Sequence, residues 1–351
     1  MRIRRTLPIV LAVVIVAAAV TVAVQLRKSA PPEPARLLPG ADAFLYANLG
    51  WARKANGGKL FLPVPHDAEY DRFIQQTGFD YERDLDSVAF AVHYPAKWPG
   101  GGTGAAAPEP RFSEVLIGRF DAGRCLSYLK QTSRSVENYN SVDIYTIPLT
   151  GRNVRIAILG IDMVAASNHD DPAVIRGMVD RSRRLASPFG GPSFLRRYYR
   201  RVQLASPVWL MARVDPSNPE FGGWGDFLPH PADVVISASY NPLLLPLRSG
   251  VLHLRAEAWA LNDDDAKAIV DKLNVFLTMF HSAEASVGSP GTDADVKTLF
   301  DSLRIRQEDN RATLYATLPT GVFRKLIEAP EEGPAAAAPE KQNQPVKAKS
   351  R

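Results

Sequence analysis

The sequence is poor in cysteine. Its 351 residues include a single cysteine, Cys125, so no disulfide can form within the chain and a disulfide-stapled scaffold is excluded. An apolar content of 46%, with 28 prolines and 24 glycines, also excludes a disordered protein and a collagen-like repeat. The chain is long enough for one or two globular domains with apolar cores.

The familiar catalytic motifs are missing as well. The sequence contains no zinc-protease helix with two histidines around a glutamate, no nucleophile elbow, no phosphate-binding GKS or GKT loop and no paired cysteines. Residues 102–107 fit a dinucleotide fingerprint, but the prolines at 108 and 110 cannot open the helix that would hold the pyrophosphate. We therefore predict no catalytic residue, no cofactor and no metal. A Ser and a His within hydrogen-bonding reach in a cleft would instead indicate a hydrolase.

Three short polar clusters have the residue types of a cation site. His66 and Glu69 are spaced as i and i+3, and residues 169–171 and 262–265 are rich in Asp. Each cluster lies where a helix cap or an acidic first turn is expected, and no further ligands converge on it. Capping is therefore the favoured interpretation of all three.

The positive net charge of +5 is concentrated at one end. Arg2, Arg4, Arg5, Arg27 and Lys28 lie in the first 28 residues, which contain no acid. Without these five cations, 37 basic residues face 37 acidic ones. Cations at the two flanks of an apolar run are typical of a membrane segment, so the charge does not indicate nucleic acid.

Residues 7–26 form an apolar run of membrane-spanning length. Its twenty positions reach the ~30 Å of a bilayer core at ~1.5 Å per residue. The alternative is a cleaved signal peptide, with small-residue sites at 17–19 or 21–23, but the run continues past both. We predict an uncleaved, single-pass signal-anchor in the inner (plasma) membrane, with the domain on the extracytoplasmic, periplasmic side. The flanking charges are nearly equal, so the orientation rests on the commoner arrangement of such anchors.

The rest of the chain divides by composition. Residues 29–40 carry four prolines and predict a stiff, extended spacer after the anchor at 1–28. Residues 329–351 combine alanine, proline and alternating charge, which predicts a disordered tail. The Pro- and Gly-containing stretch at 188–192 is expected to divide the folded part into two halves, 41–190 and 191–328.

Within the two halves the same order of elements recurs: two strands, a polar cap and a helix. Strands are expected at 88–94, 114–120, 251–261, 303–307 and 312–318 and within 142–166, and caps at Asp121, 168–171, Asn262 and 319–320. The clearest unit has a two-residue apolar period over 251–261, followed by an apolar helical stripe from Ile269 to Phe280. Because each such sheet and helix has one apolar side, we predict an α+β fold of antiparallel sheets with helices on one face.

One charged segment is unusual. Eight arginines and no acid lie between Asp180 and Asp215. The run RRYYRR predicts an amphipathic basic helix whose guanidinium groups bind phosphate or carboxylate while the tyrosines pack or stack. The candidate residues are Arg196, Arg197, Tyr198, Tyr199, Arg200 and Arg201. The alternative is a solvated face whose arginines pair with the acidic stretch 67–86.

The stretch LLPGADAFLYANLG, at 37–50, gives a strand directly after an anchor and a Pro-rich segment. In this it resembles uncharacterised membrane-anchored bacterial proteins with an extracytoplasmic domain of unknown function, and the strand-then-capped-helix units at 118–129 and 165–179 are similar to theirs. The resemblance implies a location in the cell envelope and brings no catalytic residues.

We therefore expect a non-enzymatic, membrane-tethered binding or scaffold protein of the cell envelope. Its expected partner at the arginine segment is an anionic lipid, an acidic polysaccharide or an acidic envelope protein, and not nucleic acid. The alternative is a carrier or sensor of a hydrophobic ligand held between sheet and helices. In that case residues 209–211 and 243–245 would supply the lining, although apolar stretches of this kind usually serve as core.

Overall fold

The computed structural model describes residues 30–55, 66–94, 110–183, 190–204, 206–218, 225–240, 251–287 and 294–319. In these ranges no helix is long and apolar enough to cross a membrane. The anchor expected at 7–26 and the tail expected at 329–351 lie outside the described residues, and both stay predictions.

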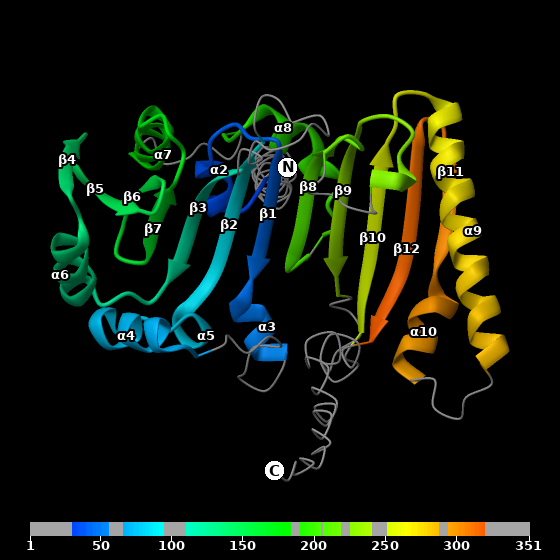
Figure 1. Ribbon diagram of the computed structural model, residues 1–351, viewed down its shortest axis with the longest axis horizontal. Helices are drawn as coiled ribbons and strands as arrows, with labels where there is room; N and C mark the ends of the chain where they lie inside the picture. Colours follow the sequence, from blue (N-terminus) through cyan, green and yellow to red (C-terminus); the bar gives the residue numbers. More distant parts are fainter. Residues whose placement is uncertain are drawn as a thin grey trace, which may run out of the picture.

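The described strands form one twelve-stranded antiparallel sheet, in the order β11-β12-β10-β9-β8-β1-β2-β3-β7-β6-β5-β4 (Figure 1). The strands are β1 Ala43–Asn48, β2 Leu85–His93, β3 Arg111–Gly118, β4 Ser135–Tyr139, β5 Val142–Leu149, β6 Arg152–Ile158, β7 Met163–Ser167, β8 Val208–Val214, β9 Ala232–Ser239, β10 Val251–Trp259, β11 Arg304–Glu308 and β12 Arg311–Pro319. The helices are α2 Glu33–Leu37, α3 Leu49–Ala55, α4 Ala68–Thr77, α5 Tyr81–Asp84, α6 Ala122–Thr132, α7 Ala173–Arg183, α8 Ser193–Tyr198, the 3-10 helix η1 Tyr199–Arg201, α9 Asp263–Val287 and α10 Ala294–Ser302.

The two halves of the sheet come from the two halves of the chain. Strands β1 to β7 lie on one side of the β1–β8 pair, and β8 to β12 lie on the other. In each half, three successive strands are neighbours, and a later hairpin or meander returns beside the third, as β7 beside β3 and β12 beside β10. The halves join through an antiparallel register in which Phe44 faces Met211 and Tyr46 faces Trp209. One continuous sheet therefore runs across the point where the sequence was expected to divide.

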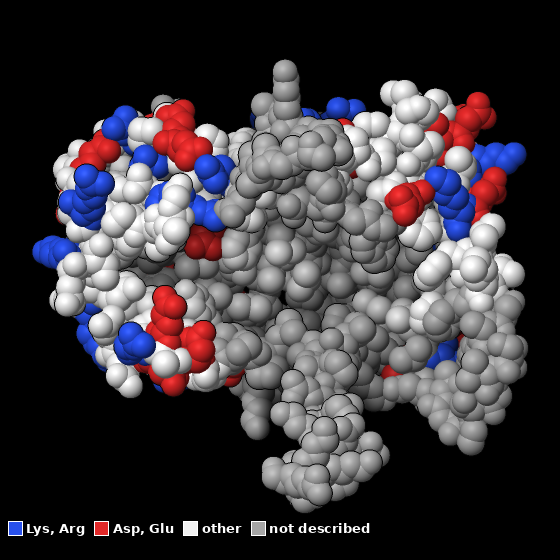
Figure 2. Space-filling model, in the orientation of Figure 1, with Lys and Arg blue, Asp and Glu red and all other residues white. Residues whose placement is uncertain are grey.

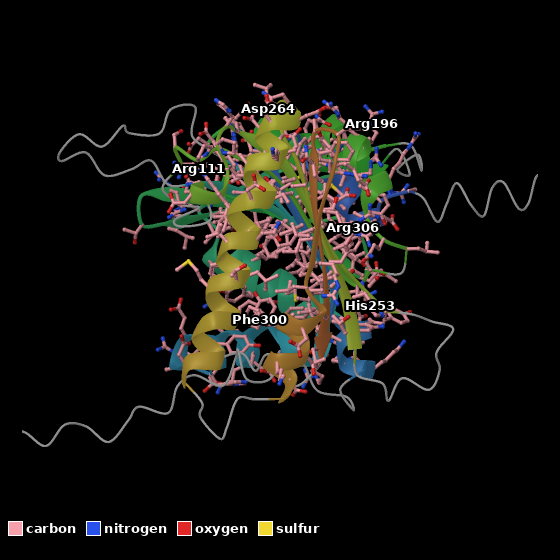
Figure 3. All side chains as sticks on the ribbon, turned by 90° about the vertical axis from the view of Figure 1, so that its right-hand side faces the viewer. Arg111, Arg196, His253, Asp264, Phe300 and Arg306 are labelled. Atoms are coloured by element: carbon pink, nitrogen blue, oxygen red, sulfur yellow. The ribbon has the colours of Figure 1, made fainter. Side chains whose placement is uncertain are left out.

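Helices cover both faces of this sheet. On one face, which we call the α8 face, Phe44 packs in a buried cluster with Leu37 of α2 and Leu195 of α8. On the other, the α9 face, Ala43 packs in a cluster with Ile269 of α9. Figure 3 shows α8 and α9 on opposite sides of the strands.

The predicted α+β class with antiparallel strands is confirmed, but the prediction that the helices lie on one face is wrong. Consecutive residues of β1, Ala43 and Phe44, are both buried, at 4% and 0% exposure. Successive side chains of a strand point to opposite faces, so both faces need cover. Helices on both sides provide it.

The segment expected to be a spacer belongs to the core. In and after α2, Ala35, Leu37 and Leu38 are at most 1% exposed, and Arg181 of α7 donates from Nε to the Leu37 carbonyl oxygen at 2.7 Å. The prediction of an extended spacer over 29–40 is therefore wrong for these residues. Proline is tolerated in the first turn of a helix, and the apolar side chains that follow it supply the driving force for docking.

The capped helices occur where the sequence predicts them. Asp121, Asp171 and Asn262 each accept a hydrogen bond from a backbone amide two or three residues later, at 2.8–3.0 Å. Asp67 does the same for α4, next to His66. Caps therefore account for the polar clusters, and the described residues contain no group of three or more His, Cys, Asp or Glu side chains placed to hold a metal ion.

Most strands of the predicted units also occur, with one difference. The stretch 142–166 forms three strands, β5, β6 and β7, and β7 pairs with β3 rather than only with its chain neighbour. Residues 95–109, which include the fingerprint-like stretch at 102–107, lie outside the described residues, and the β2 and β3 strands on their two sides pair antiparallel.

Candidate functional site

The arginine segment forms a short helix, α8, that continues into η1. Pro192 is the N-cap residue, and its carbonyl oxygen accepts the amide of Arg196 at 2.9 Å. Phe194, Leu195 and Tyr198 are buried on the inner side. The outer side carries four exposed arginines, Arg196, Arg197, Arg200 and Arg201, which we call the arginine surface. The amphipathic character expected from the sequence is therefore present.

The two tyrosines of the segment are anchors to the sheet. The Tyr198 hydroxyl donates to Asp233 Oδ2 at 2.6 Å, and its ring lies 6.2 Å from that of Trp259. The Tyr199 ring meets Trp209 edge to face at 5.6 Å. Burial raises the pKa of both tyrosines to about 12, so both hydroxyls stay neutral at physiological pH. They hold the segment in place and do not face a partner.

The arginine surface has no ion pair to a carboxylate in the described part of the chain. The guanidinium of Arg201 lies 4.6 Å from the ring centroid of Trp259, and that of Arg197 lies 5.2 Å from the ring of Tyr198. Both contacts are cation–π interactions, which orient a guanidinium without neutralising its charge. The charge of the segment is therefore available to an external anion.

The acidic stretch does not pair with these arginines, contrary to the alternative expectation from the sequence. Asp84 pairs with Arg83 and Arg119, and Asp86 pairs with Arg53. Figure 1 shows why: α4 and α5 lie at one end of the strands and α8 at the other. The arginine surface carries cations only. On the face shown in Figure 2, cations and anions are interspersed near the two ends of the long axis.

A buried ionic row lies on the α8 face beside the segment. Glu257, 1% exposed, pairs with Arg255 and, at 3.0 Å, with Arg311. The Arg311 guanidinium lies 5.0 Å from the Trp259 ring, which thus contacts both Arg311 and Arg201. Through Trp259, the ionic row is therefore in contact with Arg201 of the arginine surface.

The sequence did not indicate this row. Arg255, Glu257 and Trp259 alternate with apolar residues on β10, which is typical of a strand with one solvent-exposed side. On that side Trp259 is contacted by Tyr198 and Arg201, which belong to a segment more than fifty residues away. Trp259, a large aromatic residue among charged neighbours, was the available signal that the side is covered.

A Ser–His contact occurs but does not face a cleft. His93 Nε2 lies 3.2 Å from Ser113 Oγ, which lies 2.9 Å from Ser167 Oγ. Ser113 is completely buried, so a substrate cannot reach its hydroxyl. Burial, with the nearby His169, lowers the pKa of His93 to about 4. The group is a buried polar contact between β2, β3 and β7.

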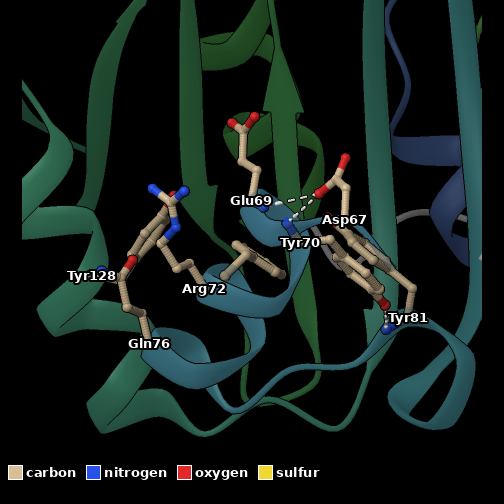
Figure 4. Close-up of a pocket in the computed structure, with 8 residues that line it drawn as sticks. Asp67, Glu69, Tyr70, Arg72, Gln76, Tyr81 and Tyr128 are labelled. Atoms are coloured by element: carbon tan, nitrogen blue, oxygen red, sulfur yellow. Dashed lines mark hydrogen bonds between the residues drawn. The ribbon is translucent and has the colours of Figure 1, made fainter. Parts of the chain in front are cut away.

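A pocket of about 430 Å³ lies against α4 (Figure 4). Its lining residues are Asp67, Glu69, Tyr70, Arg72, Phe73, Gln76, Tyr81 and Tyr128. Tyr81 stacks with Tyr70 and with Phe73, each at 5.7 Å. Ring faces and carboxylates are features that bind organic cations. Arg72 already places a cation among the lining residues, which disfavours a second cation in this pocket.

Glu114 on β3 lies close enough to Tyr81 to raise the pKa of that tyrosine, after burial as the main cause. Burial raises the pKa of Glu114 itself to about 7. In the register its neighbours are Phe90 and Ala166, and it has no hydrogen bond or ion pair in the part of the chain that the structure describes. It is a half-buried, unpartnered carboxyl on the α9 face.

The residues expected to line a hydrophobic ligand site have different places. Trp209 and Met211 are at most 1% exposed in the core of the α8 face, whereas Leu210 points to the α9 face and is half-buried. Residues 243–245 lie outside the described residues. The three residues of β8 therefore do not form one lining.

No family model and no curated protein matches this sequence. Three crystal forms of a protein named TP0453 are similar in fold. Form III has a TM-score of 0.45 at 10% sequence identity, with 85% of this chain and 98% of that chain covered. Form IV has a TM-score of 0.44 and form I of 0.41, each at 10% identity, with 85% of this chain and 97% of that chain covered. At such values the likeness carries no conclusion about this chain.

Proposed function

We propose that this chain is a non-enzymatic, membrane-tethered binding or scaffold protein of the cell envelope, and that the arginine surface binds an anionic partner. One observation carries the proposal: four exposed arginines on one short segment have no carboxylate partner among the described residues. The predicted anchor at 7–26 supports the tether and the envelope location.

The chemistry of the segment suits phosphate or carboxylate. A guanidinium group presents a planar fork of N–H donors that pairs with such anions through two parallel hydrogen bonds. Tyr198 and Tyr199 fix the backbone beneath the arginines, which limits the entropy lost when a partner binds. The guanidinium groups of Arg197 and Arg201 are also restricted by their cation–π contacts, so an acidic partner meets two donors that are partly placed.

The test uses the full-length chain in a nonionic detergent and three anionic probes: polyglutamate, a sulfated polysaccharide and phosphatidylglycerol nanodiscs. The test variant is R196Q/R197Q/R200Q, which leaves the two tyrosines and Arg201 intact. The matched control is R124Q/R304Q/R306Q, which removes the same charge from exposed sites elsewhere.

We expect the wild-type chain to bind at least one probe. The test variant should lower that affinity by about tenfold or more, because a hydrogen bond to a charged group contributes ~1.5–3 kcal/mol. The control should bind as the wild type does. The proposal is refuted if the wild type binds no probe, or if the two variants weaken binding equally.

A second candidate function is a carrier of a hydrophobic ligand. It is favoured by half-buried apolar side chains on the α9 face of the central strands, among them Leu45, Phe90, Leu210 and Ile236, with the unpartnered Glu114 beside them. Native mass spectrometry of the full-length protein from its own membranes tests it. A co-purified lipid or small molecule whose occupancy falls in L210Q supports the carrier, and a clean apo mass refutes it.

A further inference from the structure

We propose that the arginine surface binds the anionic lipid headgroups of the membrane that holds the predicted anchor. This inference rests on the proposed function and names its partner. In this proposal α8 and η1 form a second, electrostatic contact with the bilayer, and this contact determines the orientation of the domain relative to the membrane.

The first argument is the length of chain between anchor and domain. Three residues, 27–29, separate Leu26 from the first described residue, Ala30. Because Pro31 is buried and α2 is packed in the core, residues 27–30 are all that can extend, and at ~3.5 Å per residue they reach about 14 Å. The domain is therefore held close to the bilayer that residues 7–26 would span.

The second argument is the position of α8 relative to that entry point. A β-carbon on Gly191, directly before Pro192, would lie 3.3 Å from the Cα of Arg36. The residue before α8 thus contacts α2 at Arg36, ten residues after the end of the predicted span at Leu26. In Figure 3, Arg196 is at the outer edge of the α8 face, whereas Asp264 lies toward the α9 face.

The third argument separates a lipid surface from the other anionic partners. Leu204, three residues after η1, is 70% exposed. Arginines beside an exposed leucine are typical of segments that lie at the headgroup level, where the cations pair with phosphate and the apolar side chain enters the acyl boundary. A polysaccharide or a carboxylate-rich protein surface would leave Leu204 in water.

The energetic contribution of this contact is substantial. Each cation near an anionic membrane surface raises the affinity about fivefold, and the four arginines act together on one surface. An anchor fixes only one point of the domain. The second contact would favour the orientation with the α8 face toward the membrane, and the α9 face, with Glu114 and the pocket on α4, would face away.

The experiment measures the reaction of individual arginines with phenylglyoxal by mass spectrometry. The full-length protein is placed in nanodiscs of phosphatidylcholine alone or with about 30% phosphatidylglycerol, an anionic content typical of charged leaflets. Arg196, Arg197 and Arg200 are the test positions. Arg304 and Arg306, exposed on the edge strand β11, are controls within the same molecule.

We expect the anionic lipid to slow modification of the test arginines by about fivefold, the factor that ~1 kcal/mol per arginine gives. The control arginines should not change, and salt at about 0.5 M should abolish the difference by screening. L204Q should reduce the protection without removing it. Equal rates in the two lipids, or equal slowing at Arg304 and Arg306, overturn the inference.

The outcomes also separate this inference from the proposed function. Protection of the same arginines by polyglutamate or the sulfated polysaccharide, but not by lipid, overturns the lipid inference and leaves the anionic-partner function standing. Protection by none of the three overturns both. A chain that does not incorporate into either nanodisc overturns the tether and, with it, the lipid inference.

Discussion

Replacing Glu114 with glutamine should stabilise the protein at neutral pH. The carboxyl of Glu114 is half-buried on the α9 face, with Phe90 and Ala166 as its neighbours on adjacent strands. Burial raises its pKa from 4.5 to about 7, and among the described residues no cation offsets the cost of ionising it. Glutamine keeps the shape of the side chain and cannot ionise, so it removes that cost.

The sign and size follow from the linkage between ionisation and folding. Below the unfolded-state pKa of 4.5, Glu114 is protonated in both states and the substitution changes little. As the pH rises from there through the folded-state value of about 7, the unfolded chain ionises first and the folded state loses stability. At 1.36 kcal/mol per pKa unit, the full loss is about 3 kcal/mol above that window.

The assay is urea unfolding of the full-length chain and of E114Q in a nonionic detergent at pH 4 and pH 8. E114Q should match the wild type at the lower pH and exceed its free energy of unfolding by about 3 kcal/mol at the higher one. E69Q, at an exposed carboxylate, is the matched control and should follow the wild type at both. The reasoning fails if the gain of E114Q is the same at the two pH values.

Three further substitutions test the packing. L37A in α2 should lower the free energy of unfolding by about 2–5 kcal/mol, because Leu37 is 1% exposed. The same truncation in a solvated spacer would change it by almost nothing, and thermal or urea unfolding distinguishes the two. Y198F removes the 2.6 Å hydrogen bond to Asp233 and should cost about 1.5–3 kcal/mol, with Y199F, which breaks no such bond, as the milder comparison in the same unfolding assay. T313V should be neutral or stabilising by up to about 1 kcal/mol, because the buried Thr313 hydroxyl has no hydrogen-bond partner among the residues that the structure describes. A clear loss in a urea titration would show that the hydroxyl is satisfied.

The local parts of the fold could be predicted from the sequence, because their signals lie within a few residues. The two-residue period of β10 and the Asn262 cap of α9 are examples, and both are found. The order of strands could not be predicted. The pairs that define it join residues far apart in the chain, 161 to 169 residues for β1 with β8 and 46 to 54 for β3 with β7, and no local pattern encodes such a partner.

The amphipathic arginine segment was also a local signal, and its six residues are placed as that signal implies. The ionic row beneath it was not, because alternation along β10 shows which side is apolar and leaves open whether the polar side is covered. The same limit explains the helices on both faces and the burial of α2. A short apolar stretch between prolines, 35–38, has no periodicity long enough to distinguish a spacer from a docked helix.

The buried row has a consequence for how the arginine surface works. Flexible surface arginines lose side-chain entropy when they bind, which can cancel much of the gain from a single ion pair. Trp259 restricts Arg201 by contact with its guanidinium, and Glu257 in turn fixes Arg311 against the same ring. Part of the side-chain entropy of Arg201 is therefore lost during folding and is not lost again when the anion binds. It follows that W259L should weaken anion binding, although Trp259 itself does not contact the anion. In a W259L background, R201Q should then cause no further decrease in the affinity for the anion.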